Sequence, residues 1–320
     1  MADKVNREPA MKVLHWNELI AHKPLATVQS SNGSGCASVR DYISLFKLRI
    51  VALVMFIAFM AAVIAAQGLP PGGALLLMLA GLGLASAGAS ALNHYLDRGL
   101  DDLMARTRNR PLAAGRISRP WGVLMAGIGL VAISVPFSMS VNGIVAAYTM
   151  SGALVYVVVY TLWLKRRSQL NIIVGGLSGS FAALAGWAAV SPVMSPLPLM
   201  IAVLVFLWTP LHFWNFALMH REQYQRAGVP MMPVLVGRSQ AARRIFLTAV
   251  GIFLLSLAPY FLGYLGPVYL VGALGSGALL WGNLRLLRRP EAPIAWANYK
   301  LSGPYLAALF VAMAADRFFH

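Results

Sequence analysis

Residues 73 to 111 read GALLLMLAGLGLASAGASALNHYLDRGLDDLMARTRNRP, an apolar run that ends in a dense group of charges. The apolar part is long enough to cross a bilayer, which takes about 20 residues in a helix. If the helix continues beyond the apolar part, Asn93, Asp97 and Asp101 are spaced four residues apart and share one face. Carboxylates are unfavourable at a membrane boundary unless they are paired or functional. The stretch therefore predicts a membrane helix with a polar site at its end.

The side chains at this polar end are of the types that hold magnesium and diphosphate. Mg²⁺ prefers oxygen ligands and is commonly held by one or two carboxylates together with substrate phosphates. The guanidinium groups of Arg106 and Arg110, which follow the carboxylates, suit bidentate contacts with phosphate oxygens. The alternative is a solvated loop whose acids balance its arginines. That alternative explains the arginines but not the regular spacing of Asn93, Asp97 and Asp101.

The composition indicates that the whole chain is a membrane protein. Hydrophobic residues make up 59% and charged residues 11% of the sequence, and apolar runs of membrane-spanning length recur along it. We predict an all-α polytopic helical bundle with about nine transmembrane helices, in one domain over residues 41 to 320. The polar tail over residues 1 to 40 is expected to be disordered and cytoplasmic. The expected spans are 48 to 66, 73 to 92, 121 to 139, 144 to 164, 171 to 190, 197 to 218, 245 to 264, 266 to 287 and 300 to 316.

The positive charge of the chain follows from its topology rather than from a nucleic-acid partner. The formal net charge is +16, but no basic helix, zinc-ligand spacing or aromatic-interleaved groove accompanies it. With the N-terminus in the cytoplasm, every Lys and Arg except Arg317 falls on the cytoplasmic side, so the positive-inside rule predicts a C-terminus outside. The acids near the N-terminus argue against a mitochondrial transit peptide and favour a bacterial inner membrane. The single cysteine, Cys36, excludes an intramolecular disulfide and a multi-cysteine metal site.

Two cytoplasmic loops, after the second and the sixth spans, are long and rich in charge. The two spans share an orientation, which predicts a parallel repeat whose corresponding loops face each other. His212 lies in the apolar helix before the second loop, where a lone histidine is more often a hydrogen-bonded packing residue than a ligand. Lys165 belongs to a basic cluster that mainly sets topology, with a diphosphate contact as the secondary interpretation. Tyr156 and Tyr160 are interpreted as packing or interface residues.

Four stretches of the sequence resemble one family of membrane enzymes. The string NxxxDxxxDxxMxRTxxRPL at residues 93 to 112 resembles the first aspartate-rich motif of the UbiA-type membrane prenyltransferases. Within that superfamily the chain looks most like the branch that farnesylates haem. The likeness extends to AAGRIS at 113 to 118, LKRRSQLNIIVGG at 164 to 176 and WTPLHFWNFALMHREQYQRAGVPMMPV at 208 to 234.

The resemblance implies a UbiA-like fold and a particular reaction. It implies transfer of the farnesyl group of farnesyl diphosphate to a vinyl group of haem b, with addition of water, to give haem O and diphosphate. Mg²⁺ is then the expected cofactor, haem b is a substrate rather than a cofactor, and the lipid bilayer and a haem A synthase are candidate partners. By carry-over Asn93, Asp97 and Asp101 hold the metal, and the two aspartates are catalytic. The residues implied to bind substrate are Asn93, Arg106, Thr107, Arg110, Lys165, His212, Arg221, Glu222 and Tyr224.

The sequence departs from the family pattern in the second charged loop. Gln223 stands where the pattern has an aspartate, and because Gln is an uncharged and weaker metal ligand, Glu222 is the candidate substitute. Two other interpretations of the chain stay open. One is a UbiA-type prenyltransferase whose acceptor is a quinone precursor or chlorophyllide. The other is a non-catalytic haem-handling membrane protein, which would bind haem but release no diphosphate.

Overall fold

The structure, a computed structural model, describes residues 37 to 319. Most of the expected tail lies outside these residues, as does Cys36, so the disorder of the tail stays a prediction. The first described helix, α2 (Val39–Leu45), begins close to the expected domain boundary. The Ser38 hydroxyl accepts a hydrogen bond from the backbone N–H of Asp41, and the Asp41 carboxylate accepts one from the backbone N–H of Ser38. This reciprocal cap fixes the start of the helix.

Helices account for all the regular structure of the described residues, which confirms the predicted all-α fold. The second half of the fourth span is a π-helix, η1 (Val155–Trp163), followed by a short 3-10 turn, η2 (Leu164–Arg166). The other helices are α3 (Leu48–Ala66), α4 (Gly72–Asp102), α5 (Pro120–Met139), α6 (Gly143–Leu154), α7 (Asn171–Ala188), α8 (Pro196–Met219), α9 (Arg221–Arg226), α10 (Met232–Phe261), α11 (Pro267–Leu274), α12 (Ser276–Arg288) and α13 (Ala292–Phe319).

The apolar runs explain where the membrane helices lie. Within residues 37 to 319, eight helical segments are long and apolar enough to cross a membrane, at positions close to the predicted spans. The ninth predicted span lies in α13, whose apolar character is reduced by Lys300, Asp316 and Arg317. The predicted number of about nine spans is therefore close to the eight that are found within residues 37 to 319. The chain is a multi-pass membrane protein. The seventh span starts earlier than predicted, because α10 already begins at Met232. The helix bends at Gly237, whose φ of 76° favours glycine.

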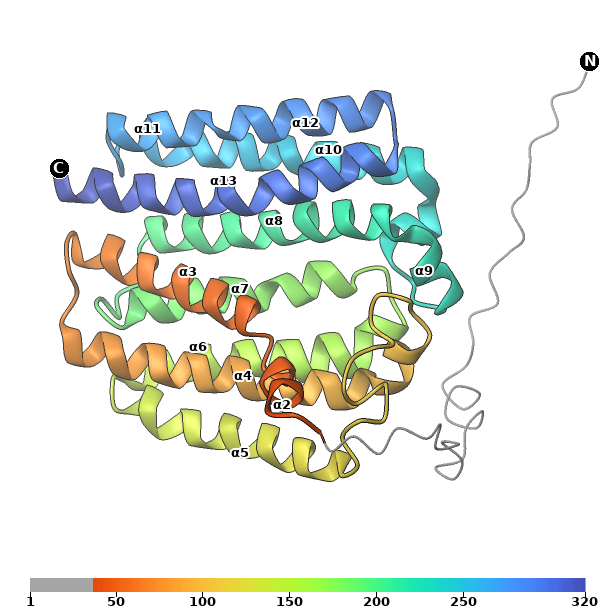
Figure 1. Ribbon diagram of the computed structural model, residues 1–320. Helices are drawn as coiled ribbons and strands as arrows, with labels where there is room; N and C mark the ends of the chain where they lie inside the picture. The colour runs from red at the N-terminus through yellow and green to blue at the C-terminus, as the bar shows by residue number, and fades with distance from the viewer. Residues whose placement is uncertain (1–36, 320) are drawn as a thin grey trace, which may run out of the picture. The chain divides into compact units, whose positions relative to one another are not determined.

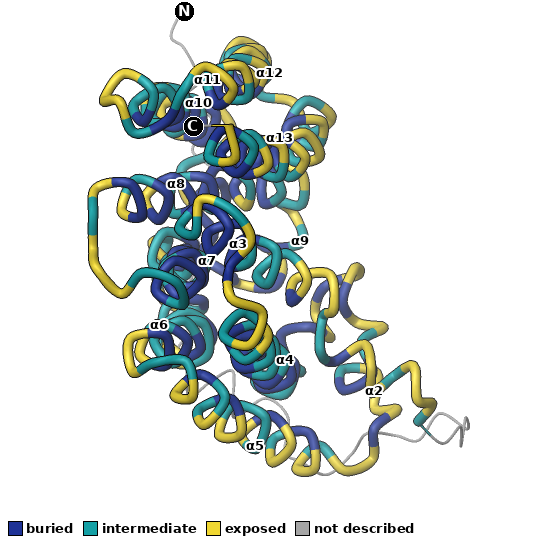
Figure 2. Tube along the Cα trace, turned by 90° about the vertical axis from the view of Figure 1, so that its left-hand side faces the viewer, coloured by how far each residue is buried: buried dark blue, intermediate teal, exposed yellow. Residues whose placement is uncertain are grey.

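The membrane helices lie side by side, with α3, α7 and α8 in the middle (Figure 1). α7 packs against α3, α6 and α8, and α8 packs in turn against α10 and α13. A large cluster of buried side chains joins α3, α7, α8, α10 and α13 and includes Ile201, Leu204 and Phe310. Figure 2 shows that buried segments concentrate in the middle helices, whereas α5 and α12 have more exposed surface. Apolar side chains such as Leu247 and Leu254 are exposed on the outside, as contact with lipid requires.

Two close helix crossings explain the runs of small residues in the second and fifth spans. Gly88 of α4 lies against the backbone of Gly127 in α5, where an added Cβ would meet the Gly127 carbonyl oxygen at 2.7 Å. Gly186 of α7 lies even more closely against the backbone of Ala58 in α3. Small residues let helix backbones approach each other in membranes. The runs of small residues in the second and fifth spans therefore serve helix packing.

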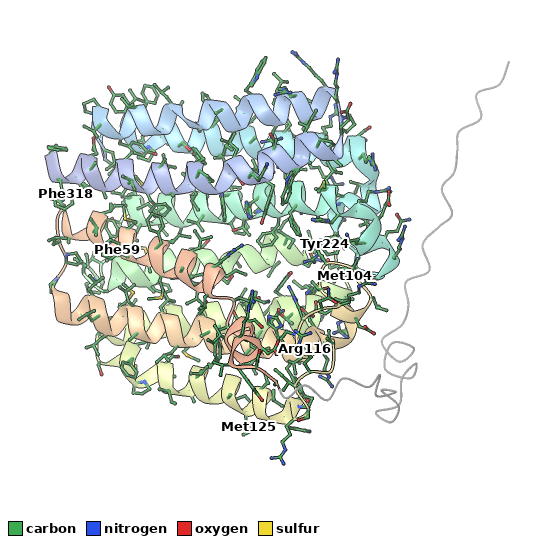
Figure 3. The ribbon with its side chains drawn as sticks, viewed as in Figure 1. Phe59, Met104, Arg116, Met125, Tyr224 and Phe318 are labelled. Atoms are coloured by element: carbon green, nitrogen blue, oxygen red, sulfur yellow. The ribbon has the colours of Figure 1, made fainter. Side chains whose placement is uncertain are left out.

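Both charged loops lie at the same end of the helix bundle. α4 continues past its apolar part to Asp102, which confirms the predicted extension of this helix. The chain over residues 103 to 119 folds back over this end, and α9 follows α8 there (Figure 1). Met104 and Tyr224 consequently lie near each other, at the end opposite to Phe318 (Figure 3).

Candidate active site

A cavity of about 330 Å³ lies between α3, α4, η1, α7 and α8. Its volume falls within the range of roughly 300 to 1,000 Å³ that is typical of ligand pockets. Near the two charged loops it is lined by Lys47, Asn93, Asp101, Arg106, Arg110, Lys165 and Tyr224. Farther along the helices the lining is mainly apolar, with Ile57, Leu82, Ala182 and Val205, and includes a few serine and threonine side chains. Such a cavity suits an amphipathic molecule with an anionic head and an apolar tail.

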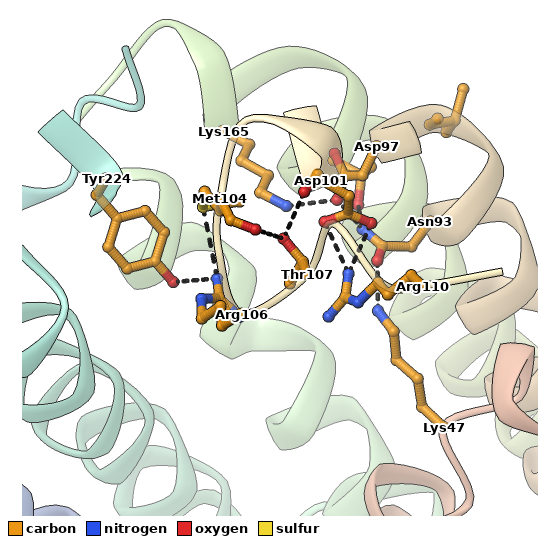
Figure 4. A network of polar contacts seen from close by, with 12 residues as sticks. Lys47, Asn93, Asp97, Asp101, Met104, Arg106, Thr107, Arg110, Lys165 and Tyr224 are labelled. Carbon is orange, nitrogen blue, oxygen red and sulfur yellow. Dashed lines mark hydrogen bonds and ion pairs between the residues drawn. The ribbon is translucent and has the colours of Figure 1, made fainter. Parts of the chain in front are cut away.

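The polar face of α4 lies within a network of side-chain contacts (Figure 4). Asn93 Nδ2 donates hydrogen bonds to Asp97 Oδ2 at 2.8 Å and to the hydroxyl of Thr161 at 3.0 Å. Arg110 Nη1 donates to both carboxylate oxygens of Asp101, at 2.9 and 2.8 Å. The structure therefore brings the three evenly spaced side chains of α4 together with the second predicted arginine.

Asp97 is fully buried and only partly satisfied by its neighbours. Its Oδ2 accepts a hydrogen bond from Asn93 and forms an ion pair with Lys165, and both of these partners line the cavity although Asp97 itself does not. Its Oδ1 has no hydrogen-bond partner among residues 37 to 319. Because an unpaired buried carboxylate oxygen is costly, this atom suits a cation.

The oxygen atoms of Asn93, Asp97 and Asp101 fit a hard cation such as Mg²⁺. In the described part of the chain, no group of three His, Cys, Asp or Glu side chains is arranged to hold a metal. Mg²⁺ usually retains waters or takes substrate phosphate oxygens as further ligands. The site therefore fits a metal that binds together with a phosphate-containing substrate.

The loop after α4 is folded by its own side chains and reaches the second charged loop. The Thr107 hydroxyl donates to the backbone oxygen of Asp101 at 2.9 Å, so Thr107 holds the loop against the end of α4. Arg106 Nη2 donates to the Tyr224 hydroxyl at 2.9 Å, and its guanidinium lies 5.2 Å from the centres of the Phe216 and Tyr224 rings. Burial raises the pKa of Tyr224. These contacts confirm the prediction that the two loops face each other.

Lys47 is a site residue that the sequence interpretation missed. It precedes α3 and lines the cavity, and its ammonium group donates to Asn93 Oδ1 and, at 3.3 Å, to the Tyr156 hydroxyl. Burial, together with the nearby Arg110 and Lys165, lowers the pKa of Lys47 to about 7. The sequence distinguishes it from other basic residues near span ends only by its position immediately before an apolar run.

The π-helix η1 brings two further unexpected residues to the cavity. Tyr156 and Tyr160, interpreted from sequence as packing or interface residues, both line it, with stacked rings whose centres are 5.8 Å apart. Lys165, in the turn that follows, lies with its ammonium nitrogen 5.7 Å from the centre of the Tyr160 ring. π-helical turns occur often at functional sites. The sequence contains no recognisable signal for this change of helix type.

The second charged loop contributes less to the cavity than predicted. Of its candidate residues only Tyr224 lines the cavity. Arg221 Nε donates to the backbone oxygen of Pro233 at 3.1 Å, which ties α9 to the start of α10. The Glu222 side chain is 71% exposed, with Arg226 3.9 Å away. Gln223 does not line the cavity, and its Oε1 has no hydrogen-bond partner within the described residues.

His212 lies next to the cavity rather than in its lining. Its ring stacks on Trp208, with centres 4.5 Å apart, and lies 4.3 Å from the ring of Tyr299. Trp208, Phe213 and Tyr299 all line the cavity. His212 Nδ1 is 2.7 Å from the hydroxyl of Ser302 in α13. The ring is therefore hydrogen-bonded and packed, as a structural histidine would be, but its immediate neighbours belong to the site.

The fold and this site define a class of membrane enzyme. Residues 54 to 311 match the model of the UbiA prenyltransferase family, and the chain belongs to that family. It is 37% identical over 307 residues to the Protoheme IX farnesyltransferase of Photobacterium profundum, with 94% of this chain and 96% of the relative covered. It is also 42% identical over 279 residues to Protoheme IX farnesyltransferase 1 of Paramagnetospirillum magneticum, with 87% of this chain and 98% of the relative covered.

Solved structures show the same fold at low sequence identity. A structure described as digeranylgeranylglyceryl phosphate synthase matches with a TM-score of 0.75 at 16% identity, covering 88% of this chain and 99% of that one. A UbiA homologue from Archaeoglobus fulgidus, bound to GPP and Mg²⁺, matches with a TM-score of 0.62 at 18% identity, covering 85% and 99%. These likenesses confirm the predicted UbiA-like fold.

Proposed function

We propose that this protein transfers the farnesyl group of farnesyl diphosphate to a vinyl group of haem b, with addition of water, and releases haem O and diphosphate. The observation that carries the proposal is the two-part cavity, which joins a charged end to an apolar interior. Farnesyl diphosphate has the same two parts. The relatives named protohaem IX farnesyltransferase favour a haem acceptor over a quinone precursor or chlorophyllide.

The charged end of the cavity suits the diphosphate group. Lys47, Arg106, Arg110 and Lys165 line this end and would contact the phosphate oxygens. The bonds from Arg110 to Asp101 hold its guanidinium in place before substrate arrives. Preorganised cations of this kind stabilise the negative charge that develops on a leaving group, because they need no reorganisation during the reaction.

Magnesium would be held by Asp97, Asp101 and Asn93 in this proposal. When bound, it would neutralise charge on the diphosphate and so favour departure of the leaving group. The unpartnered Oδ1 of Asp97 supports a cation at this place. The Archaeoglobus fulgidus homologue bound to GPP and Mg²⁺ supports the same expectation.

The reaction itself follows from the chemistry of the two substrates. The bond between C1 of the farnesyl group and the diphosphate oxygen breaks, and its electron pair leaves with diphosphate. The π electrons of the haem vinyl group form the new carbon–carbon bond to C1. This leaves a cation on the vinyl carbon next to the porphyrin ring, which takes up water and releases a proton to solvent. The protein's task is to hold the charges and to delay the entry of water.

The apolar interior keeps water away from the allylic cation. Its lining of aliphatic side chains, such as Ile57, Leu82 and Val205, offers no hydrogen bonds to water and suits a farnesyl chain. Excluding water also strengthens the electrostatic contacts at the charged end. Tyr156 and Tyr160 line the same space, and aromatic rings attract positive charge.

The haem acceptor would approach from the side of α8 and α13. His212 lies there among aromatic side chains, and a neutral imidazole is a common axial ligand of haem iron. Tyr224 remains a candidate contact for substrate at the rim, whereas Arg221 and Glu222 do not line the cavity. A haem A synthase, which would use the product, remains a candidate partner.

We infer the orientation of the protein from its charges. The charged end, with both loops, would face the cytoplasm of a bacterium, with the N-terminus inside and the C-terminus outside the inner membrane. Haem and farnesyl diphosphate would then enter from the cytoplasmic side. Cysteine accessibility in spheroplasts, with single cysteines placed in the loop over residues 103 to 119 and near Phe318, tests this orientation.

The test of the reaction is mass analysis of haem extracted after purified protein has been incubated with haem b, farnesyl diphosphate and Mg²⁺. We expect a farnesylated and hydrated haem from the wild type and unmodified haem from Asp97→Ala. Unmodified haem from both proteins, with farnesylation of a quinone precursor or chlorophyllide by the wild type, would assign a different acceptor. Haem binding without release of diphosphate from any acceptor would indicate a non-catalytic haem-handling protein.

A further inference from the structure

We propose that Ser302 of α13 is a positioning residue that fixes the tautomer of His212, so that Nε2 is the nitrogen presented to the haem iron. The binding of haem iron by His212 rests on the proposed function. The tautomer is a property of the protein alone and can be measured without any substrate.

The tautomer follows from counting protons at the Ser302 hydroxyl. Its oxygen is 2.7 Å from His212 Nδ1 and 2.8 Å from the backbone oxygen of Tyr299, and it has one proton to donate. If that proton pointed to His212, the oxygens of Ser302 and Tyr299 would face each other at 2.8 Å without a proton between them. If it points to Tyr299, Nδ1–H of His212 donates to Ser302 and both contacts are hydrogen bonds. A neutral imidazole then has its free lone pair on Nε2.

The surrounding side chains hold the imidazole in this position. Trp208 and Tyr299 lie 4.5 and 4.3 Å from it, measured between ring centres. Trp208 Nε1 donates to the backbone oxygen of Ser302 at 2.8 Å, which joins α8 to α13 at the same level. Ser302 is fully buried, so water does not compete for its hydroxyl.

His212 Nε2 remains available on the opposite edge of the ring. It forms no hydrogen bond with residues 37 to 319, and it is not fully buried. Trp208 and Tyr299, on either side of the ring, line the cavity. An imidazole that ligates a metal through one nitrogen usually donates the other N–H to a fixed acceptor, which sets its tautomer and orientation. Ser302 fills the role of that acceptor.

The first experiment measures the tautomer directly. Full-length protein labelled with ¹⁵N-histidine is studied in lipid nanodiscs, without haem, by NMR of the imidazole nitrogens, and His212→Gln assigns the signal. We expect a protonated Nδ1 and an unprotonated Nε2 in the wild type, and loss of this preference in Ser302→Ala. A wild-type His212 with its proton on Nε2 would overturn the proposal.

The second experiment measures haem binding by absorption titration and the iron–imidazole bond by resonance Raman spectroscopy. Loss of a hydrogen-bond partner of a metal ligand typically lowers metal affinity by about 10 to 100-fold. We expect Ser302→Ala to weaken haem binding to that extent and to shift the iron–imidazole band, with farnesyl diphosphate affinity unchanged. Ser302→Thr, which keeps the hydroxyl, should restore both. Alanine is compatible with a helix interior, so the fold should persist.

The matched control is Ser256→Ala in α10. The Ser256 hydroxyl is also buried, donates to the backbone oxygen of Ile252 at 2.7 Å and contacts the Tyr305 hydroxyl at 2.7 Å. This variant should leave the haem spectrum and affinity unchanged.

The outcomes separate the positioning role from the proposed function. If wild-type protein farnesylates haem while Ser302→Ala binds haem with wild-type affinity and spectrum, the role of Ser302 is wrong and the proposed function stands. If the wild type shows the expected tautomer but neither binds nor modifies haem, the proposed function is wrong and the tautomer stands as a packing feature.

Discussion

The two charged loops occupy corresponding positions after α4 and α8, yet they place their carboxylates very differently. In the first loop region Asp97 and Asp101 are 0% and 2% exposed and are paired with Lys165 and Arg110. In the second, the Glu222 side chain is 71% exposed. A charge pair in a region that excludes water interacts far more strongly than one in solvent. The same kind of side chain is therefore part of the site in one loop and a surface group in the other.

The difference indicates that the site is divided between the two halves of the molecule, each of which would hold a different substrate. The first half supplies the paired carboxylates and the cations, which suit a leaving diphosphate. The second half supplies Tyr224 together with the aromatic surroundings of His212, which suit a flat acceptor. The hydrogen bond from Arg106 to Tyr224 joins the two halves. The following experiments test this division.

Asp97→Asn should have the largest effect, a loss of turnover of about 10³-fold, because charge stabilisation at a reacting group is worth this much. Asn keeps the shape of Asp97 but removes the charge that holds a cation. Turnover is measured as diphosphate release. Asp102→Asn is the matched control, since Asp102 lies in the same helix but is exposed and does not line the cavity. Wild-type turnover of Asp97→Asn would exclude the metal role.

A loss of fold must be separated from a loss of chemistry in this variant. Removing one member of a buried ion pair leaves the other charge, here Lys165, without its partner, and such changes cost about 3 to 5 kcal/mol. The double variant Asp97→Asn with Lys165→Met removes both charges and should recover part of the thermal stability. It should remain inactive. Recovery of activity together with stability would show that Asp97 serves the fold only.

Arg110→Lys should lower kcat/KM for farnesyl diphosphate by roughly 10 to 100-fold, because lysine lacks the planar fork that binds phosphate. Arg108→Lys is the control, since Arg108 is exposed and does not line the cavity. Steady-state kinetics at saturating haem measures both. An equal effect of the two changes would mean that the loop contributes only its general positive charge.

His212→Ala should weaken haem binding by at least the roughly 10 to 100-fold that is typical when a metal ligand loses its hydrogen-bond partner, because this change removes the proposed ligand itself. Binding of farnesyl diphosphate should be unchanged, because His212 does not line the cavity and its ring contacts none of the cations at the charged end. Separate titrations of the two substrates measure the difference. Equal losses for both substrates would point to a structural role in the packing of α8 against α13.

Glu222→Gln and Gln223→Asp should each change turnover by no more than about twofold, as is typical of substitutions outside a site. Neither residue lines the cavity. A loss on replacing Glu222 that approached the loss for Asp97 would show that the second loop also holds a metal. A clear gain from Gln223→Asp would show that the second motif is degraded in this chain.

Asp41→Asn should have the smallest effect, and one that depends on pH. Hydrogen bonds from Arg116 hold the pKa of Asp41 below its usual value of 3.8. The ionised carboxylate therefore stabilises the docking of α2 above that value, and the contribution is lost as the pH falls through the lowered pKa. The Tm of the wild type should exceed that of Asp41→Asn at pH 7, and the gap should close in acid. Arg116→Met, which leaves the helix cap intact, should reproduce the difference.

The sequence predicted the fold well because the bilayer constrains it strongly. Every backbone polar group must be satisfied inside a membrane, so apolar runs of sufficient length form helices whatever their neighbours are. All nine predicted spans lie in helices, and within residues 37 to 319 eight segments are long and apolar enough to cross a membrane. The continuation of α4 to Asp102 gives the even spacing of its polar residues the shared face that a helix requires. The weaker ninth span, in α13, is the one whose charged residues lower its apolar character.

Parts of the site could not be predicted from local pattern. Lys47, in the link between α2 and α3, contacts Asn93 of α4 and Tyr156 of η1, and no spacing within the sequence connects the three. Residues 155 to 163 carry no recognisable sequence signal for a π-helix, although they form one. Glu222, the candidate substitute for the aspartate of the family motif, is exposed and does not line the cavity.

The sequence by itself therefore determined the membrane helices and the polar face of α4, because each depends on periodicity and on the high cost of burying charge in lipid. The orientation in the membrane stays a prediction from the distribution of positive charge. Only the tertiary structure decided which cations pair with Asp97 and Asp101 and which tyrosines line the cavity. It also decided which nitrogen of His212 carries the proton that is donated to Ser302. Those features depend on distances of a few ångströms between helices far apart in the chain, and hydrogen bonds and ion pairs form only at such distances.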